Sequence, residues 1–185
     1  MTVLERQNQD VPECMNDSNL GYFNKYVDWI MPKCKGNMLE IGCGLGYVSE
    51  LIAYSDKVIS IECTDKLKEI EVSHPKIRFH SILTEKMLSG TLFSDSMFDS
   101  VVCTEHIEHL EEKYHLPLLK WIKSHLTEGG IFLGSMPIKV TPEPTNEFHI
   151  KEYTLREWCE LIWQVFPEAE VTRIDNLFVW ESNGR

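Results

Sequence analysis

Several features typical of membrane and secreted proteins are missing from this chain of 185 residues. No apolar run approaches the roughly 20 residues that a membrane-spanning helix needs. The six cysteines include no C-x-x-C pair. Cys43, Cys63 and Cys103 fall at or near the ends of predicted strands, which is typical of small buried residues in a reducing compartment and excludes a disulfide framework. Residues 1–16 are polar and acidic, unlike a secretory or transit peptide, so we expect a cytoplasmic protein.

Positive charge is also scarce. The chain has 18 lysine and arginine residues against 29 aspartate and glutamate residues, which gives a net charge of −11. Proteins that bind DNA or RNA backbones concentrate lysine and arginine, whereas this chain offers only the short Lys33-x-Lys35. We therefore do not expect nucleic acid as a partner, and a small neutral or cationic molecule suits the charge better.

The composition is otherwise that of a soluble globular domain. Hydrophobic residues make up 43% of the chain and charged residues 25%, both ordinary values. A chain of this length can bury one proper core. We expect a flexible N-terminal arm over residues 1–19 and a single domain over residues 20–185, with no internal repeat, linker or inserted domain.

The most informative segment joins an apolar strand, predicted over residues 37–41, to a glycine-rich turn. The strand contains Glu40, and glycines follow it at every second position, as Gly42, Gly44 and Gly46. A helix is predicted directly after them. Glycines allow a tight turn from strand to helix and leave no side chain between the backbone and a ligand. The pattern Glu-x-Gly-x-Gly-x-Gly therefore predicts a ligand-binding turn.

A second acidic residue supports this interpretation. Glu62 closes the next apolar run, predicted as a strand over residues 57–62, and lies twenty positions after Gly42. This is about the spacing at which a second strand brings a carboxylate to a ribose. Together the turn and the acid predict a cofactor that carries a nucleoside, bound at the carboxyl end of a parallel sheet.

Two common nucleotide motifs do not match. The dinucleotide fingerprint G-x-G-x-x-G would need a third glycine where the chain has Tyr47. Nothing in the chain matches the P-loop pattern G-x-x-x-x-G-K-[ST]. A nucleotide-dependent oxidoreductase is therefore disfavoured and a P-loop protein is excluded.

The glycine turn and the second acid resemble those of the class I S-adenosylmethionine-dependent methyltransferases. The resemblance implies that Glu40 contacts the amino group of the cofactor, often through water, and that Glu62 binds its ribose. It implies that the backbone of Gly42, Gly44 and Gly46 lies against the amino acid and the sugar. Many members carry an acid after the third strand for the adenine, but residues 81–85 read Ser-Ile-Leu-Thr-Glu. We therefore assign Leu83 and Thr84 to the cofactor pocket, together with Thr104 at the end of the fourth strand.

Strands alternate with helices along most of the chain, which favours a parallel sheet with helices on both faces. A possible short helix follows the third strand, the pair Gly129-Gly130 is expected to end a later helix, and Thr154 to Glu157 read as a capping box. Asp175-Asn176 suggests a closing hairpin. The expected fold is an α/β, Rossmann-like three-layer αβα sandwich, with a mostly parallel seven-stranded sheet whose last strand is antiparallel, as in the methyltransferases.

The segment after the fourth strand, Cys103 to Leu110, is expected on the acceptor side of the cofactor. It resembles the E-x-x-E-H-L stretch of small-molecule and sugar O-methyltransferases. If the segment is helical, Glu105, Glu108 and His109 share one face. They could form a proton relay with His109 as the base, or bind a divalent ion. His149, in the long segment after the fifth strand, could complete either set, and Tyr153 could contact the substrate.

We therefore expect an S-adenosylmethionine-dependent methyltransferase that methylates a hydroxyl of a small molecule or sugar and releases S-adenosylhomocysteine. The favoured interpretation includes no metal and takes Glu105, Glu108, His109 and His149 as candidate catalytic residues. One alternative is a metal-dependent enzyme like the small-RNA 3′-end methyltransferases, with those four residues around the ion. Another is a protein that binds S-adenosylmethionine without catalysis.

Overall fold

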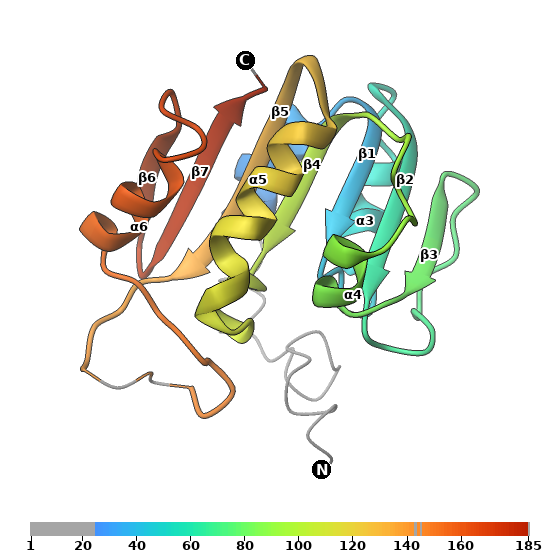
Figure 1. Ribbon diagram of the computed structural model, residues 1–185. Helices are drawn as coiled ribbons and strands as arrows, with labels where there is room; N and C mark the ends of the chain where they lie inside the picture. Colours follow the sequence, from blue (N-terminus) through green and yellow to red (C-terminus); the bar gives the residue numbers. More distant parts are fainter. Residues whose placement is uncertain (1–24, 143, 145, 185) are drawn as a thin grey trace.

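The computed structural model describes residues 25–142, 144 and 146–184, so the expected arm over residues 1–19 lies outside it. Its strands form one seven-stranded sheet in the order β3-β2-β1-β4-β5-β7-β6 (Figure 1). Neighbouring strands are parallel from β3 to β5, and β7 runs antiparallel to both β5 and β6. This confirms the expected mostly parallel sheet with its last strand reversed. No helix in the described residues is long and apolar enough to cross a bilayer.

The elements follow one another as the sequence pattern predicts. The strands are β1 (Gly36–Ile41), β2 (Val58–Asp65), β3 (Ile77–Ser81), β4 (Phe98–Thr104), β5 (Leu126–Pro137), β6 (Glu170–Ile174) and β7 (Leu177–Asn183). In the described part of the chain the α-helices are α3 (Tyr47–Ala53), α4 (Thr84–Ser89), α5 (His115–His125) and α6 (Leu155–Ile162), and residues 25–30 are also helical. Short 3₁₀ turns are η2 (Met31–Lys33), η3 (Ile107–His109) and η4 (Glu112–Tyr114).

Helices cover both faces of the sheet, which gives the three expected layers. Successive residues of a strand point to opposite faces, and here both sets are buried. Leu39 and Phe132 pack in one core cluster with α4, α5 and α6, whereas Met38 and Leu133 pack in the other with α3 and residues 25–30. Figure 1 shows α4, α5 and α6 on the near face and α3 behind the sheet.

Strand β2 is longer than predicted. It continues past Glu62 to Asp65, and Cys63 and Thr64 pair with Glu40 and Ile41 of β1. Cys63 is 0% and Thr64 2% exposed, so both fit a buried pleated strand. The prediction that Glu62 closes the second strand is therefore wrong, and the carboxylate at the end of β2 belongs to Asp65.

Strand β5 also begins earlier than predicted. The pair Gly129-Gly130 does not end helix α5, which stops at His125, but lies within the strand. Gly129 has a φ of 73°, in the left-handed region, and the pairing of β5 with β4 shifts register between Phe98 and Ser100. An irregularity of this kind inside a strand accommodates a glycine that sequence patterns assign to a turn.

Helix α6 begins with the predicted capping box. The Thr154 hydroxyl accepts a hydrogen bond from the Glu157 amide, and the Glu157 side chain accepts one from the Thr154 amide at 2.8 Å. Further along the helix, Trp158 packs against Trp180 of β7, with ring centroids 4.6 Å apart. The cap and the tryptophan pair fix the point at which the long segment after β5 returns to the sheet.

The capping box gives the first prediction. Thr154→Ala removes an acceptor for an amide at the helix start and should lower the free energy of unfolding by about 1 kcal/mol. Arg156→Ala is the matched control on the same helix, because the Arg156 side chain is 87% exposed and its ion pair is with the neighbouring Glu160. It should cost less than about 0.5 kcal/mol. Urea denaturation of both variants measures this, and equal costs would contradict the capping role.

Candidate functional site

The glycine loop is fastened to the end of β2. The amides of Gly42 and Cys43 donate hydrogen bonds to the Thr64 carbonyl at 2.8 and 3.1 Å. The amide of Gly44 donates to Oδ2 of Asp65 at 3.0 Å. These contacts fix the loop and the Asp65 carboxylate relative to each other, at the edge where parallel strands collect ligands.

Gly42 leaves room for a histidine that sequence reasoning did not select. A Cβ on Gly42, whose φ is 74°, would lie 2.2 Å from the ring of His106. The Nε2 atom of His106 lies 2.8 Å from the Thr84 hydroxyl. Burial is the main reason that the pKa of His106 falls to about 3, so the ring is neutral.

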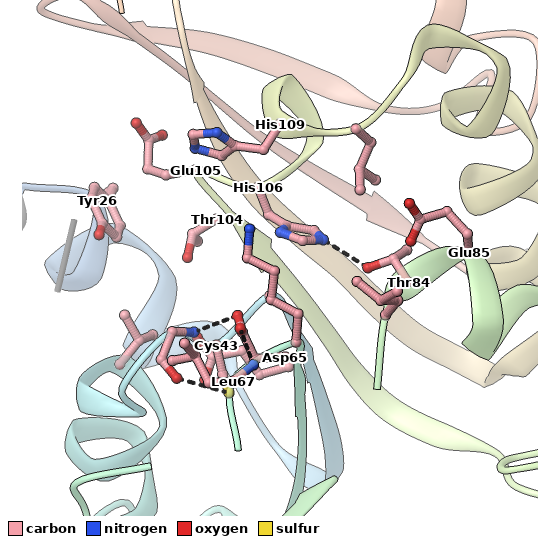
Figure 2. A pocket seen from close by; sticks show the side chains of 17 residues that line it. Tyr26, Cys43, Asp65, Leu67, Thr84, Glu85, Thr104, Glu105, His106 and His109 are labelled. Carbon is pink, nitrogen blue, oxygen red and sulfur yellow. Dashed lines mark hydrogen bonds between the residues drawn. The ribbon is translucent and has the colours of Figure 1, made fainter. Parts of the chain in front are cut away.

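A pocket of about 280 Å³ opens at the carboxyl ends of β1, β2 and β4. Of the site residues expected from the sequence, it is lined by Glu40, Gly42, Gly44, Leu83, Thr84, Thr104, Glu105 and His109. Asp65, Lys66 and His106 also line it, although sequence reasoning did not select them. Figure 2 shows Glu105 and His109 on the side of the pocket opposite Asp65.

Gly46 lies beside this pocket without lining it. It is the N-cap of α3, with a φ of 92° that L side chains rarely adopt. A Cβ there would lie 2.6 Å from Cγ2 of Val72. Its contribution is therefore to let the chain turn tightly into α3 against the segment that holds Val72.

Glu62 lies outside the pocket, and Asp65 takes the position expected for it. The Glu62 carboxylate contacts Nη1 of Arg78 at 3.3 Å and Nε2 of His80 at 2.5 Å, both on β3. The Asp65 carboxylate accepts hydrogen bonds from the amides of Gly44 and Leu67, each at 3.0 Å. Burial raises the pKa of Asp65, an effect that the two amides oppose. The signal for Asp65 was the pair Cys63-Thr64, which continues the strand.

Glu40 sits deeper, on β1 itself. Its side chain is 1% exposed and accepts a hydrogen bond from the Ser49 hydroxyl of α3. It lines the inner part of the pocket. Strand β1 and helix α3 therefore hold this carboxylate in place between them.

The acceptor segment is not the helix that would place its three polar residues on one face. Glu105 has a φ of 47°, and only Ile107–His109 form a 3₁₀ turn. The Glu105 carboxylate lines the pocket and accepts a hydrogen bond from the Ser135 hydroxyl at 2.8 Å. Glu108 points elsewhere: it is 0% exposed and does not line the pocket. The backbone turn at Glu105 separates the two carboxylates.

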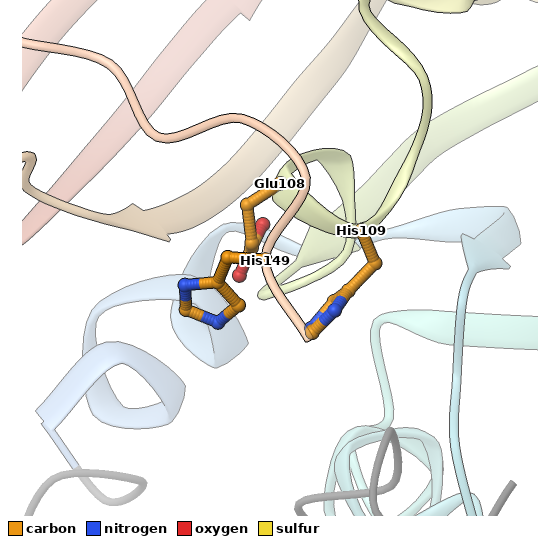
Figure 3. A group of neighbouring side chains, drawn as sticks. All are labelled: Glu108, His109 and His149. Carbon is orange, nitrogen blue, oxygen red and sulfur yellow. The ribbon is translucent and has the colours of Figure 1, made fainter. Parts of the chain in front are cut away.

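A second group of polar side chains lies next to the pocket and consists of Glu108, His109 and His149. One donor atom of each lies within 4.8 Å of the others, and Figure 3 shows the three side chains directed toward a common point. Nδ1 of His149 lies 2.6 Å from Glu152, and Nδ1 of His109 lies 2.9 Å from the Phe148 carbonyl. Burial lowers the pKa of His109 to about 4 and holds the pKa of Glu108 well above its usual range.

Tyr153 does not face the acceptor side. It is 4% exposed, and its hydroxyl lies 2.6 Å from Nδ1 of His115, which is itself 1% exposed. The ring also packs near Trp158. Tyr153 is therefore part of the core beneath the long segment after β5, and the expectation that it contacts the substrate is wrong.

A sequence profile of a methyltransferase domain family matches residues 21–174. The chain belongs to this family. The methyltransferase is 31% identical, over 76% of its chain and 55% of the relative, to a probable S-adenosylmethionine-dependent methyltransferase of Mycolicibacterium smegmatis. It is 26% identical, over 72% of its chain and 68% of the relative, to a ubiquinone biosynthesis O-methyltransferase of Haemophilus ducreyi. It spans little more than half the length of the first of these.

The fold of the methyltransferase is also that of solved relatives. N-methyltransferase NodS from Bradyrhizobium japonicum WM9, in complex with S-adenosyl-L-homocysteine, superposes with a TM-score of 0.66 at 13% identity, over 98% of this chain and 95% of that one. The chain thus combines a methyltransferase domain sequence with the fold of a solved methyltransferase. The family match favours a methyltransferase over the oxidoreductase alternative.

The contact of Gly42 with His106 gives the second prediction. Gly42→Ala should lower the free energy of unfolding by about 2–4 kcal/mol, because it combines a left-handed φ with overpacking against the ring. In a His106→Ala background only the cost of the backbone remains, so the same change should cost about 1–2 kcal/mol. Urea denaturation of the four proteins measures the coupling. An equal cost in both backgrounds would show that ring and glycine do not touch.

Proposed function

We propose that this methyltransferase transfers the methyl group of S-adenosylmethionine to a hydroxyl group of a small molecule or sugar. The observation that carries the proposal is the make-up of the pocket. The Asp65 carboxylate lies at one side of it, and Glu105 and His109 lie at the other (Figure 2), while Glu40 and Thr104 also line it. A cofactor held at the first side would present its methyl group to the second.

Asp65 is the residue that we assign to the ribose. A carboxylate offers about four acceptor positions, and the amides of Gly44 and Leu67 use only part of them. Asp65 lines the pocket, and in this proposal two ribose hydroxyls donate to the positions that remain. This is the role that the sequence assigned to Glu62, moved to the acid that ends β2.

Glu40 and the glycine loop suit the amino acid end of the cofactor. The Glu40 carboxylate is almost fully buried, so a cationic amino group nearby would be strongly favoured over solvent. Gly42 and Gly44 place backbone against the ligand without side chains. Leu83 is 45% exposed beside Thr84 and offers an apolar surface for the adenine.

The reaction needs little from the protein beyond alignment. The sulfonium makes its methyl group electrophilic, the acceptor oxygen forms a bond to that carbon as the sulfur–carbon bond breaks, and the acceptor loses a proton. We assign the proton to Glu105, because its carboxylate lines the pocket and Ser135 holds it in place. The left-handed backbone at Glu105 is a local strain of the kind found at functional sites.

The similarity to a ubiquinone biosynthesis O-methyltransferase supports a small hydroxyl acceptor, and the net charge of −11 opposes nucleic acid. NodS is an N-methyltransferase, so an amine is the main competing acceptor. A second candidate function, metal-dependent methylation of an RNA 3′ end, is favoured by one observation, the grouping of Glu108, His109 and His149.

The assignment of the ribose acid is tested by a matched pair of variants. Asp65→Asn should weaken the binding of S-adenosylhomocysteine by about 10- to 100-fold, because it removes the charge that accepts the ribose hydroxyls. Glu62→Gln should change it by less than about twofold, because Glu62 contacts only Arg78 and His80 among the described residues. Isothermal titration calorimetry measures both. A larger loss of affinity in Glu62→Gln than in Asp65→Asn would show that Glu62 binds the ribose.

The acceptor class is tested by release of S-adenosylhomocysteine in the presence of phenols, catechols, sugars, matched amines and a short RNA with a free 3′ hydroxyl. We expect turnover with a small hydroxyl compound. With that acceptor, Glu105→Gln should lower kcat by about 100-fold or more and leave cofactor affinity unchanged. Turnover with amines alone or RNA alone would refute the proposed acceptor, and equal loss of kcat and cofactor affinity would make Glu105 structural.

A further inference from the structure

The Glu108 carboxylate is buried away from solvent, where a carboxylate needs a hydrogen-bond partner or a cation. The residue is 0% exposed, and neither of its oxygens has a hydrogen-bond partner among the described residues. Its neighbours Glu105 and Glu152 are also acidic and raise the local negative potential. An ionised carboxylate in such a place is strongly disfavoured unless a cation approaches it.

Two imidazoles close to Glu108 are held in the form that binds metals. The Phe148 carbonyl can only accept, so Nδ1 of His109 carries the hydrogen and donates it. Nδ1 of His149 likewise donates to the Glu152 carboxylate. Both rings therefore keep their lone pair on Nε2. Nε2 of His149 is buried and has no partner among the described residues.

The surroundings also hold these donors near each other. The amides of Ile150 and Lys151 donate to the backbone carbonyl of Glu108 at 2.7 and 3.1 Å. These bonds tie the segment that carries His149 to the turn that carries Glu108 and His109. A carboxylate behind a histidine, as Glu152 lies behind His149, is the usual support of a metal-bound imidazole.

We propose that Glu108, His109 and His149 bind one divalent transition-metal ion of the Zn²⁺ or Co²⁺ type. Two imidazole nitrogens and one carboxylate oxygen suit such ions, whereas Mg²⁺ and Ca²⁺ prefer oxygen alone. Donor atoms around a tetrahedral ion with bonds of about 2.1 Å lie about 3.5 Å apart. The donors here lie within 4.8 Å of one another, so binding draws the side chains slightly together.

The structure places three donors at this point and not the four that the sequence pattern suggested. Glu105 is absent from the group and is held by Ser135. Three protein ligands leave a coordination position open, and His109 also lines the pocket. The ion therefore lies next to the acceptor end of the pocket, where a bound metal would polarise an acceptor oxygen. The binding itself does not depend on the proposed methyl acceptor.

The test is metal binding by the full chain after treatment with a chelator. Calorimetry with Zn²⁺, Co²⁺ and Mg²⁺ should show one Zn²⁺ or Co²⁺ ion per chain, with an affinity far above that for Mg²⁺. The visible absorption of bound Co²⁺ gives a second readout that needs no activity. Glu108→Gln and His149→Gln should each weaken binding by about 100-fold or more, and Glu152→Gln by about 10- to 100-fold with an altered Co²⁺ spectrum.

Matched controls are His125→Gln and Glu128→Gln, which change a histidine and an exposed carboxylate on α5 and β5, outside the group. Both should bind Co²⁺ as the wild type does. Binding of S-adenosylhomocysteine confirms that each variant is folded. If Glu108→Gln does not fold, metal binding by His149→Gln provides the test instead. Absence of Co²⁺ absorption in the wild type, a preference for Mg²⁺, or unchanged binding by His149→Gln would overturn the site. If the wild type binds no metal but still methylates its acceptor, the metal site is refuted and the proposed function is not.

Discussion

Three backbone amides of the loop between β1 and α3, those of Gly42, Cys43 and Gly44, donate to the last two residues of β2. The rest of the site depends on this junction. It fixes the Asp65 carboxylate beside a stretch of backbone without side chains and starts α3 at the position where Ser49 reaches Glu40. It also exposes the face of Gly42 to the His106 ring. A change at any one of these points therefore disturbs the others, because they share a few short contacts.

Much of the fold was predictable because its signals are local. Apolar runs bounded by Gly42 or by Asp175-Asn176 mark strands and turns, and Thr154 with Glu157 marks a helix start. The errors arose where pairing overrides local preference. Cys63 and Thr64 continue β2 because both neighbouring strands pair with them, so the carboxylate at the end of the strand is that of Asp65 and not that of Glu62. Gly129 joins β5 because an irregular register accommodates it.

The site was predictable in its residue types and less so in its geometry. The sequence placed Glu105, Glu108 and His109 in one group, but the left-handed residue at Glu105 turns its carboxylate toward the pocket and leaves Glu108 buried. No periodicity encodes such a turn. His149 joins Glu108 across about forty residues through backbone bonds from Ile150 and Lys151, a long-range contact that spacing alone does not reveal. The fold thus separates the Glu105 carboxylate, which lines the pocket, from the group formed by Glu108, His109 and His149.

In the proposed function one pocket, between the acid that ends β2 and the polar turn after β4, holds the cofactor in a fixed direction. A crystal structure with S-adenosylhomocysteine tests this most directly. We expect both ribose hydroxyls to donate to Asp65, the adenine to lie against Leu83 and Thr84, and the sulfur to face Glu105. A ligand bound in the opposite direction, or ribose hydroxyls bound by Glu62 while Asp65 stays bound only to its amides, would contradict this proposal.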